Sequence, residues 1–269
     1  MGTFAAQLLK GKTAFIAGGS SGINLGIAHG LAEAGASIAL ISRHIEKVEA
    51  AVAELQTAGY EASGAAADVR DYPGVEQALR DVHAARGSID IVVSGAAGNF
   101  LAPAIGMSAN AFKTVIDIDL MGTFHVLRAS YEFLRKPGAS VISISAGQAV
   151  NPTMFQSHAC AAKAGINMLT RCLAMEWGAA GVRVNAISPG PIRDTEGMAR
   201  LTPTLESEAA LKRVIPLGDY GEKRDIADLA VYLCSESAKY ITGAILDCDG
   251  GFSLAGGGAV APATIPARP

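Results

Sequence analysis

The first residues whose types and spacing could do chemistry form a glycine-rich segment, Gly18 to Gly26 (GGSSGINLG). This segment follows a short apolar run and opens an amphipathic stretch that predicts a helix. Small residues there let the backbone approach a pyrophosphate, which the N–H groups at the helix start also attract. A tight turn without a ligand is the alternative, but the position in a βαβ unit favours a dinucleotide. The expected cofactor contacts here are Gly18, Ser20, Ser21, Gly22 and Ile23.

One residue of this segment departs from the usual pattern. Asn24 occupies a position where such loops normally have glycine. Because asparagine tolerates positive φ better than most residues, we expect the turn to survive the change.

The residues after the second expected strand indicate which dinucleotide binds. An acidic residue there would bond the ribose 2′-hydroxyl of NAD, but the chain has Arg43 followed by His44. A guanidinium suits a 2′-phosphate, so Arg43 predicts NADP(H), with a solvated surface arginine as the alternative. Asp68 and Val69 end the third expected strand. They either border the adenine ring or begin a helix, and both interpretations stay open.

A carboxylate interrupts one of the apolar stretches of the chain. Asp119 is flanked by Val115, Ile116, Ile118 and Leu120. An unpaired role at the surface is therefore not expected. Either a local partner satisfies Asp119 inside a helix, or the residue is used in catalysis, which is the interpretation we favour.

The elements that must position these residues alternate between short strands and helix-length amphipathic stretches. Apolar runs separated by helices predict a parallel sheet covered on both faces. We therefore expect an α/β fold, a Rossmann-like doubly wound parallel sheet of about seven strands. The expected strands are Thr13–Ala17, Ser37–Ile41, Ala65–Val69, Ile89–Val93, Val141–Ser145, Val182–Ile187 and a last one from Ala244.

The remaining segments complete the expected organisation. Long helices are expected over Ala109–Leu134 and Ser157–Trp177, and a mobile loop over Pro191–Pro203. No linker interrupts the pattern, so residues 1–254 are expected to form a single nucleotide-binding and catalytic domain. Residues 255–269, rich in Gly, Ala and Pro, are expected to form a flexible tail.

The composition excludes several classes of protein. The 269 residues are 50% apolar and 17% charged, unlike a disordered chain. The net charge of -3 gives no basic surplus for nucleic acid, and no apolar run reaches the ~20 residues of a membrane span. With neither a secretory nor an SKL-type peroxisomal signal, we expect the protein in the cytoplasm. The cysteines are interpreted as reduced thiols and not as a metal site: Cys160, Cys172, Cys234 and Cys248.

Several motifs together resemble the short-chain dehydrogenase/reductase family over about residues 8–252. They are the GGSSGI loop, Asp68-Val69, Gly95-Ala96-Ala97-Gly98, Lys163, Asn185 with Pro189-Gly190, Ile241-Thr242-Gly243 and Asp249-Gly250-Gly251. The resemblance implies a nicotinamide cofactor and usually a homotetramer, in which the two long helices form the dimer contact. It also implies that Lys163 bonds the nicotinamide ribose. Further cofactor contacts are implied at Ala96, Pro189, Gly190 and Ile192.

Three positions depart from that family's pattern. Ala159 stands four residues before Lys163, where the family has tyrosine. Ala146 stands at the usual serine, and Asp119 at the usual asparagine. Because the phenol is the ordinary acid for ketone and alcohol chemistry in this fold, we expect such chemistry to be poor. This argues against a 3-oxoacyl reductase.

A closer resemblance accommodates these departures. The segments Ala96–Leu101, Ala111–Asp119, Ala174–Gly178 and Pro189–Gly197 are similar to the 2,4-dienoyl-CoA reductases, particularly the peroxisomal type. Those enzymes also lack the tyrosine and carry the aspartate. The resemblance implies NADPH-dependent reduction of a 2,4-dienoyl-CoA thioester to a trans-3-enoyl-CoA in unsaturated fatty acid degradation.

This interpretation gives each candidate residue a role. A water held by Asp119 and Lys163 would protonate C2 after hydride reaches C5, while Asn99 and the adjacent backbone would stabilise charge on the thioester oxygen. His158 is a minor candidate acid, because one residue turns a helix by ~100°. A helix N-terminal or interface role suits His158 equally. Two other functions stay open: a short-chain reductase of another enoyl or oxoacyl thioester, and a catalytically inactive NADP(H)-binding protein.

Overall fold

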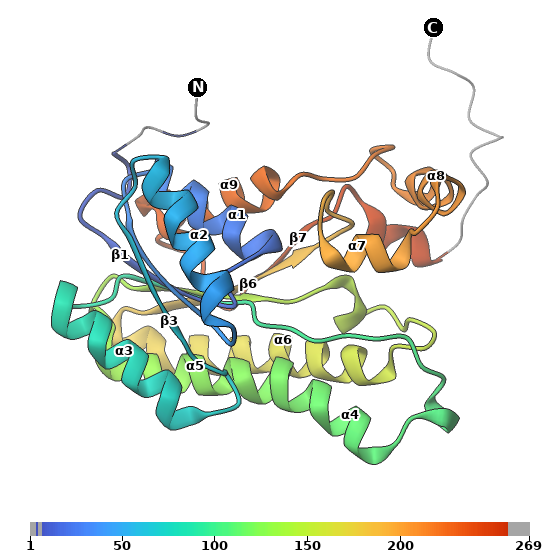
Figure 1. Cartoon of the computed structure of the whole chain (residues 1–269), viewed down its shortest axis with the longest axis horizontal. Coiled ribbons are helices and arrows are strands. Elements are labelled where there is room, and N and C mark those ends of the chain that lie inside the picture. The colour runs from blue at the N-terminus through green and yellow to red at the C-terminus, as the bar shows by residue number, and fades with distance from the viewer. Residues whose placement is uncertain (1–3, 5–6, 258–269) are drawn as a thin grey trace, which may run out of the picture.

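A parallel sheet of seven strands forms the centre of the part of the chain described by this computed structural model, residues 4 and 7–257 (Figure 1). The strand order is β3-β2-β1-β4-β5-β6-β7. The order reverses between β1 and β4, which creates the crevice where such sheets bind ligands. The strands are β1 (Thr13–Ala17), β2 (Ser37–Ser42), β3 (Ala62–Ala66), β4 (Ile91–Ser94), β5 (Ser140–Ile144), β6 (Arg183–Pro189) and β7 (Ile245–Cys248).

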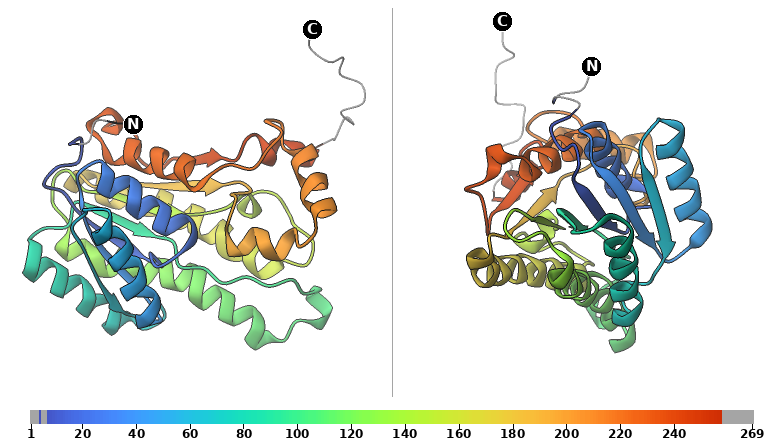
Figure 2. Two further views of the ribbon diagram at one scale, coloured as in Figure 1. Left: turned by 45° about the horizontal axis from the view of Figure 1, so that its top comes forward. Right: turned by 90° about the vertical axis from the view of Figure 1, so that its left-hand side faces the viewer.

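Helices cover both faces of the sheet, as Figure 2 shows from two directions. One face carries α1 (Gly22–Glu33), α2 (Ile45–Thr57) and α9 (Lys223–Cys234), which bury apolar side chains against the strands. The other face carries α3 (Tyr72–Arg86), α5 (Gly122–Ser130) and α6 (Ser157–Trp177). Two apolar cores therefore sandwich the sheet, and the predicted Rossmann-like doubly wound fold is confirmed.

The long helix expected over Ala109–Leu134 is not one regular helix. It consists of α4 (Ala109–Val115), a π-helical segment (Ile116–Met121), α5 and a short 3-10 turn (Tyr131–Phe133). A π-helical turn inserted in an α-helix frequently marks a functional site. Here the inserted turn carries Asp119.

The third strand differs from its expected position. It runs over Ala62–Ala66 and not over Ala65–Val69. Its residues are small, and a Cβ built on Gly64 would lie 2.4 Å from Val48 Cγ1 of α2. The strand is paired with β2 along its whole length, and Gly64 lies close against α2. Because it lacks an apolar run, the apolar pattern misplaced it.

The segment expected to be an irregular mobile loop, Pro191–Pro203, contains a helix. Helix α7 (Glu196–Leu201) begins after Thr195, whose side chain accepts a hydrogen bond from the Met198 N–H. Helix α8 (Leu205–Val214) follows, with a capping box formed by Thr204 and Ser207. These caps satisfy backbone donors at the helix starts, which explains why a polar stretch folds into short helices.

The expected C-terminal tail starts within a described element. Residues 255–257 belong to a 3-10 helix, Phe252–Gly257. The rest of the expected tail, 258–269, lies outside the described residues, and the domain limits stay a prediction.

Candidate active site

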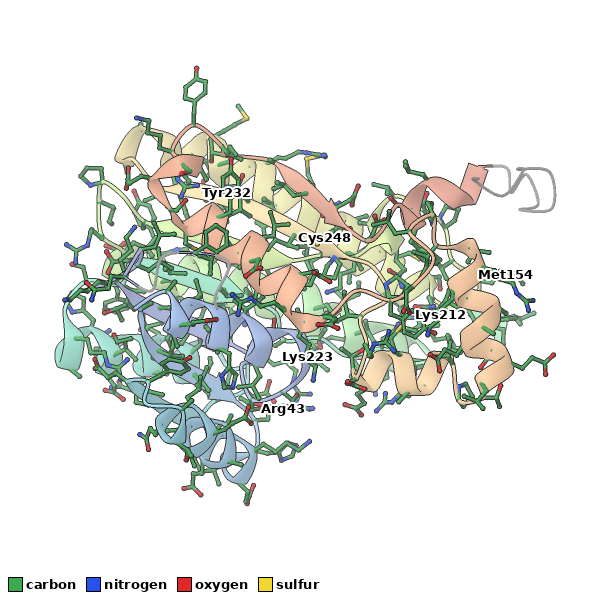
Figure 3. The ribbon with its side chains drawn as sticks, turned by 90° about the horizontal axis from the view of Figure 1, so that it is seen from above. Arg43, Met154, Lys212, Lys223, Tyr232 and Cys248 are labelled. Carbon is green, nitrogen blue, oxygen red and sulfur yellow. The ribbon has the colours of Figure 1, made fainter. Side chains whose placement is uncertain are left out.

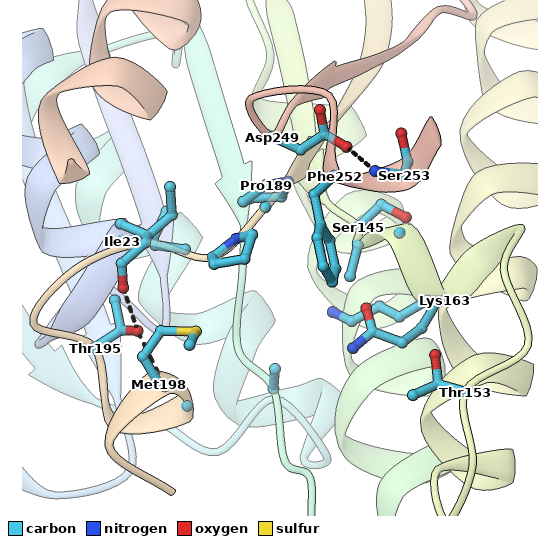
Figure 4. Close-up of a pocket in the computed structure, with 18 of the residues that line it drawn as sticks. Ile23, Ser145, Thr153, Lys163, Pro189, Thr195, Met198, Asp249, Phe252 and Ser253 are labelled. Atoms are coloured by element: carbon cyan, nitrogen blue, oxygen red, sulfur yellow. Dashed lines mark hydrogen bonds between the residues drawn. The ribbon is translucent and has the colours of Figure 1, made fainter. Parts of the chain in front are cut away.

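A cavity of about 960 Å³ lies at the carboxyl ends of the strands. This is a volume typical of small-molecule and cofactor sites. Its walls come from the loops after β1, β4, β5 and β6 and from α7 and α8, as the close-up in Figure 4 shows in part. Among the residues predicted to contact the cofactor, Gly22, Ile23, Lys163, Pro189, Gly190 and Ile192 line the cavity.

The glycine loop has the close-packed geometry that a nucleotide phosphate needs. Gly18 has φ 75° and Gly22 has φ 59°. A Cβ built on Gly18 would lie 2.8 Å from the Ala96 backbone, whereas a Cβ on Gly22 would meet nothing within 4 Å. The loop thus leaves open space at the start of α1, where N–H groups can receive a phosphate. These residues fit a dinucleotide.

Asn24 was expected to fit the turn by adopting a positive φ, but the structure shows a different arrangement. It lies inside α1 and has no positive φ. Its Nδ2 group donates to the carbonyl oxygens of Gly18 at 3.2 Å and Gly95 at 2.8 Å. A Cβ on Gly95 would lie 2.1 Å from Asn24 Oδ1, so only glycine fits beside it. The asparagine therefore links the phosphate loop to the end of β4, and the reasoning from φ was wrong.

Arg43 and Asp68 lie outside the residues that line the cavity. Arg43, which Figure 3 labels, is exposed just past the end of β2. The Arg70 guanidinium donates to both oxygens of Asp68, and this holds the pKa of that carboxyl below its usual range, with a smaller contribution from the charge of Arg43. Val69 is buried, and its carbonyl oxygen lies 2.8 Å from His125 Nδ1.

Asp119 and Lys163 form a buried ion pair. Their side chains approach to 3.4 Å between Lys163 Nζ and Asp119 Oδ2. Asp119 is 1% exposed and also accepts a 2.7 Å hydrogen bond from the Gly98 N–H. Lys163 donates to the Ile144 carbonyl oxygen at 3.0 Å. The sequence predicted that these two residues act together, and the π-helical turn and α6 bring their side chains into contact.

The two members of this pair have different access to the cavity. Lys163 lines it, and its side chain points into it in Figure 4. Asp119 does not line it and lies against Lys163 and the Gly98 backbone. The ammonium is therefore the group that can meet a ligand or a bound water, while the carboxylate holds that ammonium in place.

Alanines occupy the two positions where the family has its tyrosine and its serine. Ala159 is buried, and Ala146 lines the cavity. The neighbouring Ser145 also lines the cavity, but its hydroxyl donates to Asn167 Oδ1 at 2.6 Å. No tyrosine is among the residues that line the described cavity. The acid that this fold ordinarily uses for carbonyl reduction is thus absent from these walls.

Sequence reasoning named Asn99 but missed two glutamine side chains that belong to the same hydrogen-bonded group. Asn99 Nδ2 donates to Gln156 Oε1 at 2.7 Å, and Gln148 Nε2 approaches the same oxygen at 3.4 Å. Gln148 and Gln156 line the cavity, whereas Asn99 does not. No motif marks either glutamine, because the turn after β5 and the start of α6 bring them into the site.

His158 packs as an aromatic ring. It is fully buried and stacks on Phe100 with ring centroids 4.3 Å apart. Neither ring nitrogen has a hydrogen-bond partner among the described residues, and His158 does not line the cavity. This arrangement supports packing beneath the Asn99–Phe100 turn and not the acid role considered for it.

Two classes of site are not found in the described part of the chain. Within residues 4 and 7–257, no group of His, Cys, Asp and Glu side chains could hold a metal ion. No helix in the same residues is long and apolar enough to cross a membrane.

The comparisons with known proteins agree with this geometry. A family model described as enoyl-(acyl carrier protein) reductase matches residues 17–253. A protein of Arabidopsis thaliana named peroxisomal 2,4-dienoyl-CoA reductase [(3E)-enoyl-CoA-producing] is 40% identical over 93% of this chain and 87% of its own length. A protein of the same name from Pongo abelii is 42% identical over 92% of this chain and 86% of its own.

A solved structure has the same fold. The gluconate 5-dehydrogenase of Burkholderia cenocepacia, solved in complex with NADP and tartrate, superposes with a TM-score of 0.86. It is 28% identical over 93% of this chain and 98% of that one.

The cytoplasmic location expected from the sequence stays a prediction, since the relatives reported above are named peroxisomal. This chain belongs to the short-chain dehydrogenase/reductase family.

Proposed function

We propose that this protein reduces 2,4-dienoyl-CoA thioesters to trans-3-enoyl-CoA thioesters with NADPH. The observation that carries the proposal is the Asp119–Lys163 pair beside a cavity whose walls lack a phenol. Ketone reduction needs an acid at the carbonyl oxygen. Reduction of a conjugated thioester needs a proton only at carbon, after the electrons have moved along the π-system. The curated relatives named dienoyl-CoA reductases support the same substrate class.

The chain's own residues have distinct tasks in this reaction. Bound NADPH supplies the hydride that adds to C5 of the dienoyl group. The C4=C5 electrons move to C3=C4, and the C2=C3 electrons move toward the thioester, which becomes a dienolate. Polar groups near Asn99 stabilise the charge on its oxygen. A water held by the Asp119–Lys163 pair delivers a proton to C2, which leaves the C3=C4 double bond.

The cofactor is bound by the glycine loop and by the ends of the strands. Nucleotide contacts are proposed at Gly18, Ser20, Ser21, Gly22 and Ile23, and at Asp68, Val69, Ala96, Pro189, Gly190 and Ile192. Lys163 bonds the nicotinamide ribose. Arg43 binds the 2′-phosphate that separates NADPH from NADH.

Arg43→Ala tests this specificity. A hydrogen bond to a charged group contributes about 1.5–3 kcal/mol, so kcat/KM for NADPH should fall about 10- to 100-fold. The value for NADH should change little, since NADH has no 2′-phosphate. Arg80→Ala, which removes an exposed arginine paired with Glu76 on α3, is the matched control. If the ratio of kcat/KM for NADPH to kcat/KM for NADH is unchanged in the Arg43 variant, Arg43 does not bind the 2′-phosphate.

One assay separates the proposed function from its alternatives. NADPH oxidation is followed with 2,4-hexadienoyl-CoA, 2,4-decadienoyl-CoA, crotonyl-CoA and acetoacetyl-CoA. The proposal expects turnover of the dienoyl thioesters. Turnover of crotonyl-CoA or acetoacetyl-CoA alone would indicate another enoyl or oxoacyl reductase. NADPH binding with no turnover would indicate an inactive cofactor-binding protein.

We also propose that the protein forms a homotetramer through α4, α5 and α6. Apolar side chains at helical spacing are exposed on α6, where Met168 is 57% and Met175 86% exposed. Phe112, Met121 and Phe124 add to the exposed apolar surface of the neighbouring helical segments. Such clustering on a monomer indicates an interface.

The double variant Met168→Glu/Met175→Glu tests the assembly. Charges on this face should disrupt the contact, because an unpaired charge is costly to bury. Sedimentation velocity should then give a smaller species than the parent protein. Exposed Tyr240, far along the chain after α9, allows the control substitution Tyr240→Phe. An unchanged sedimentation coefficient in the charged variant would exclude this face as the contact.

A further inference from the structure

The amide of Gln156 is held in one orientation by its neighbours. Asn99 Nδ2, at 2.7 Å, and Gln148 Nε2, at 3.4 Å, both point at Gln156 Oε1. With the Asn99 and Gln148 amides as the structure places them, reversing the Gln156 amide alone would bring three donor groups together with no acceptor between them. The oxygen of Gln156 is therefore committed to the protein, and its nitrogen points the other way.

The nitrogen of Gln156 keeps both of its hydrogens available. Gln156 is only 4% exposed, yet it lines the cavity. Its Nε2 atom is not among the buried polar atoms without a partner, and it has no hydrogen-bond partner among the described residues. A buried donor that is fixed by two neighbours and has no protein acceptor is prepared for a ligand acceptor.

The location of Gln156 suits one particular atom of the substrate. Gln156 precedes α6, and Lys163 follows seven residues later on nearly the same helix face, about 10 Å along the axis. In a dienoyl thioester the carbonyl oxygen is far along the chain from C5, which takes the hydride, whereas C2, which takes the proton, is bonded to the carbonyl carbon. One wall of the cavity therefore carries an amide N–H for the oxygen and an ammonium whose bound water serves the adjoining C2.

We propose that Gln156 Nε2 donates a hydrogen bond to the thioester oxygen and stabilises the dienolate. This inference rests on the proposed function and names the residue that performs one of its steps. Asn99 and Gln148 are positioning residues that act through Gln156 by holding its Oε1. The carboxamide is neutral and pre-oriented, so no reorganisation is needed when charge arrives on the substrate oxygen.

Gln156→Glu is the sharpest test of this role. A carboxylate keeps an acceptor for Asn99 and Gln148, but it presents a second oxygen to the developing anion. Loss of one such donor costs about 100- to 1,000-fold in kcat, and we expect a loss of this size with little change in KM for NADPH. Protonated Glu can donate again, so the activity of the variant relative to the parent should rise as pH falls through the carboxyl titration. Gln156→Met should lose activity without this recovery.

The matched control is Gln7→Glu, which makes the same change of atoms and charge at an exposed residue beside Lys10. A second readout follows substrate binding directly. A hydrogen bond to the thioester oxygen polarises the conjugated system, so bound 2,4-hexadienoyl-CoA should absorb at longer wavelength than the free thioester. The Gln156→Met variant should bind the substrate with a smaller red shift.

The outcomes separate this inference from the proposed function. A parent protein that neither reduces nor binds dienoyl-CoA overturns both. A parent protein that reduces dienoyl-CoA, with parental kcat and the full red shift in both Gln156 variants, overturns the role of Gln156 alone. If Gln156→Glu does not fold, Gln156→Met and Asn99→Ala decide the question by the same shift. In Asn99→Ala the shift should be reduced but not abolished.

Discussion

Asp119→Asn should lower kcat for dienoyl-CoA reduction by about 100- to 10,000-fold, the range that a lost proton-transfer group costs. Asparagine is isosteric and can still accept the 2.7 Å hydrogen bond from the Gly98 N–H, so the local backbone should persist. The change removes the negative charge that faces the Lys163 ammonium at 3.4 Å. The ammonium then keeps the Ile144 carbonyl oxygen but loses its charged partner, and the proton no longer has a route to C2. Steady-state kinetics with saturating NADPH measures the effect.

The neighbouring Asp117→Asn is the matched control for this variant. Asp117 lies two residues earlier in the same π-helical turn, but it pairs with Lys113 at the surface at 2.5 Å. A surface pair of this kind contributes little, so kcat should stay close to that of the parent protein. If Asp119→Asn retains parental kcat, the pair does not carry the proton.

Lys163→Met should reduce the free energy of unfolding by about 3–5 kcal/mol, the cost of breaking a buried ion pair by removing one partner. Asp119 is 1% exposed, so its carboxylate would keep only the Gly98 N–H as a partner among the described residues. Activity should also fall about 100- to 10,000-fold, because the same ammonium is the member of the pair that lines the cavity. Urea unfolding and steady-state kinetics give the two values.

The double variant Asp119→Asn/Lys163→Met tests whether the lost stability comes from the unpaired charge of Asp119. Removing both charges leaves no uncompensated ion, so most of the lost stability should return. The loss in kcat should be no larger than in the worse single variant, because the two residues act as one unit. Additive losses of both stability and kcat would show that the residues act independently.

The sequence located the strands best where they are rich in apolar residues and fully buried. The residues of β1 and β5 are buried at every position. These strands could therefore be located from their own residues, without knowledge of the neighbouring elements. The edge strand β3 consists of Ala, Ser and Gly, and it is placed by its pairing with β2, with Gly64 close against Val48. That contact spans two elements, so no local pattern could locate it.

Other differences have equally specific causes. The periodicity of residues 109–134 fits a helix, but it does not reveal the π-helical turn that aims Asp119 toward Lys163. Helix α7 is only six residues long and depends on the Thr195 cap, so a polar and Pro-containing sequence hides it. The sequence singled out Asn24 because it stands where glycine is usual. Its function is to bind two carbonyl groups from separate loops.

The site was predicted where residues belong to motifs and missed where they do not. Lys163 and Asp119 stood out because a family pattern and an apolar context marked them. Gln156 lies on no motif, and its role emerges only when Asn99 and Gln148 both point at its oxygen. Hydrogen bonds among side chains from three separate segments cannot be predicted from the spacing of residues along the sequence.

The fate of each hydrogen tests the central claim most directly. The protein is incubated with 2,4-hexadienoyl-CoA and NADPH in D₂O, and the product is analysed by NMR and mass spectrometry. We predict a trans-3-enoyl thioester with one solvent-derived deuterium at C2 and the hydride from NADPH at C5. A 2-enoyl product with solvent deuterium at C4, or no reduction of the dienoyl thioester while acetoacetyl-CoA is reduced, would contradict the account.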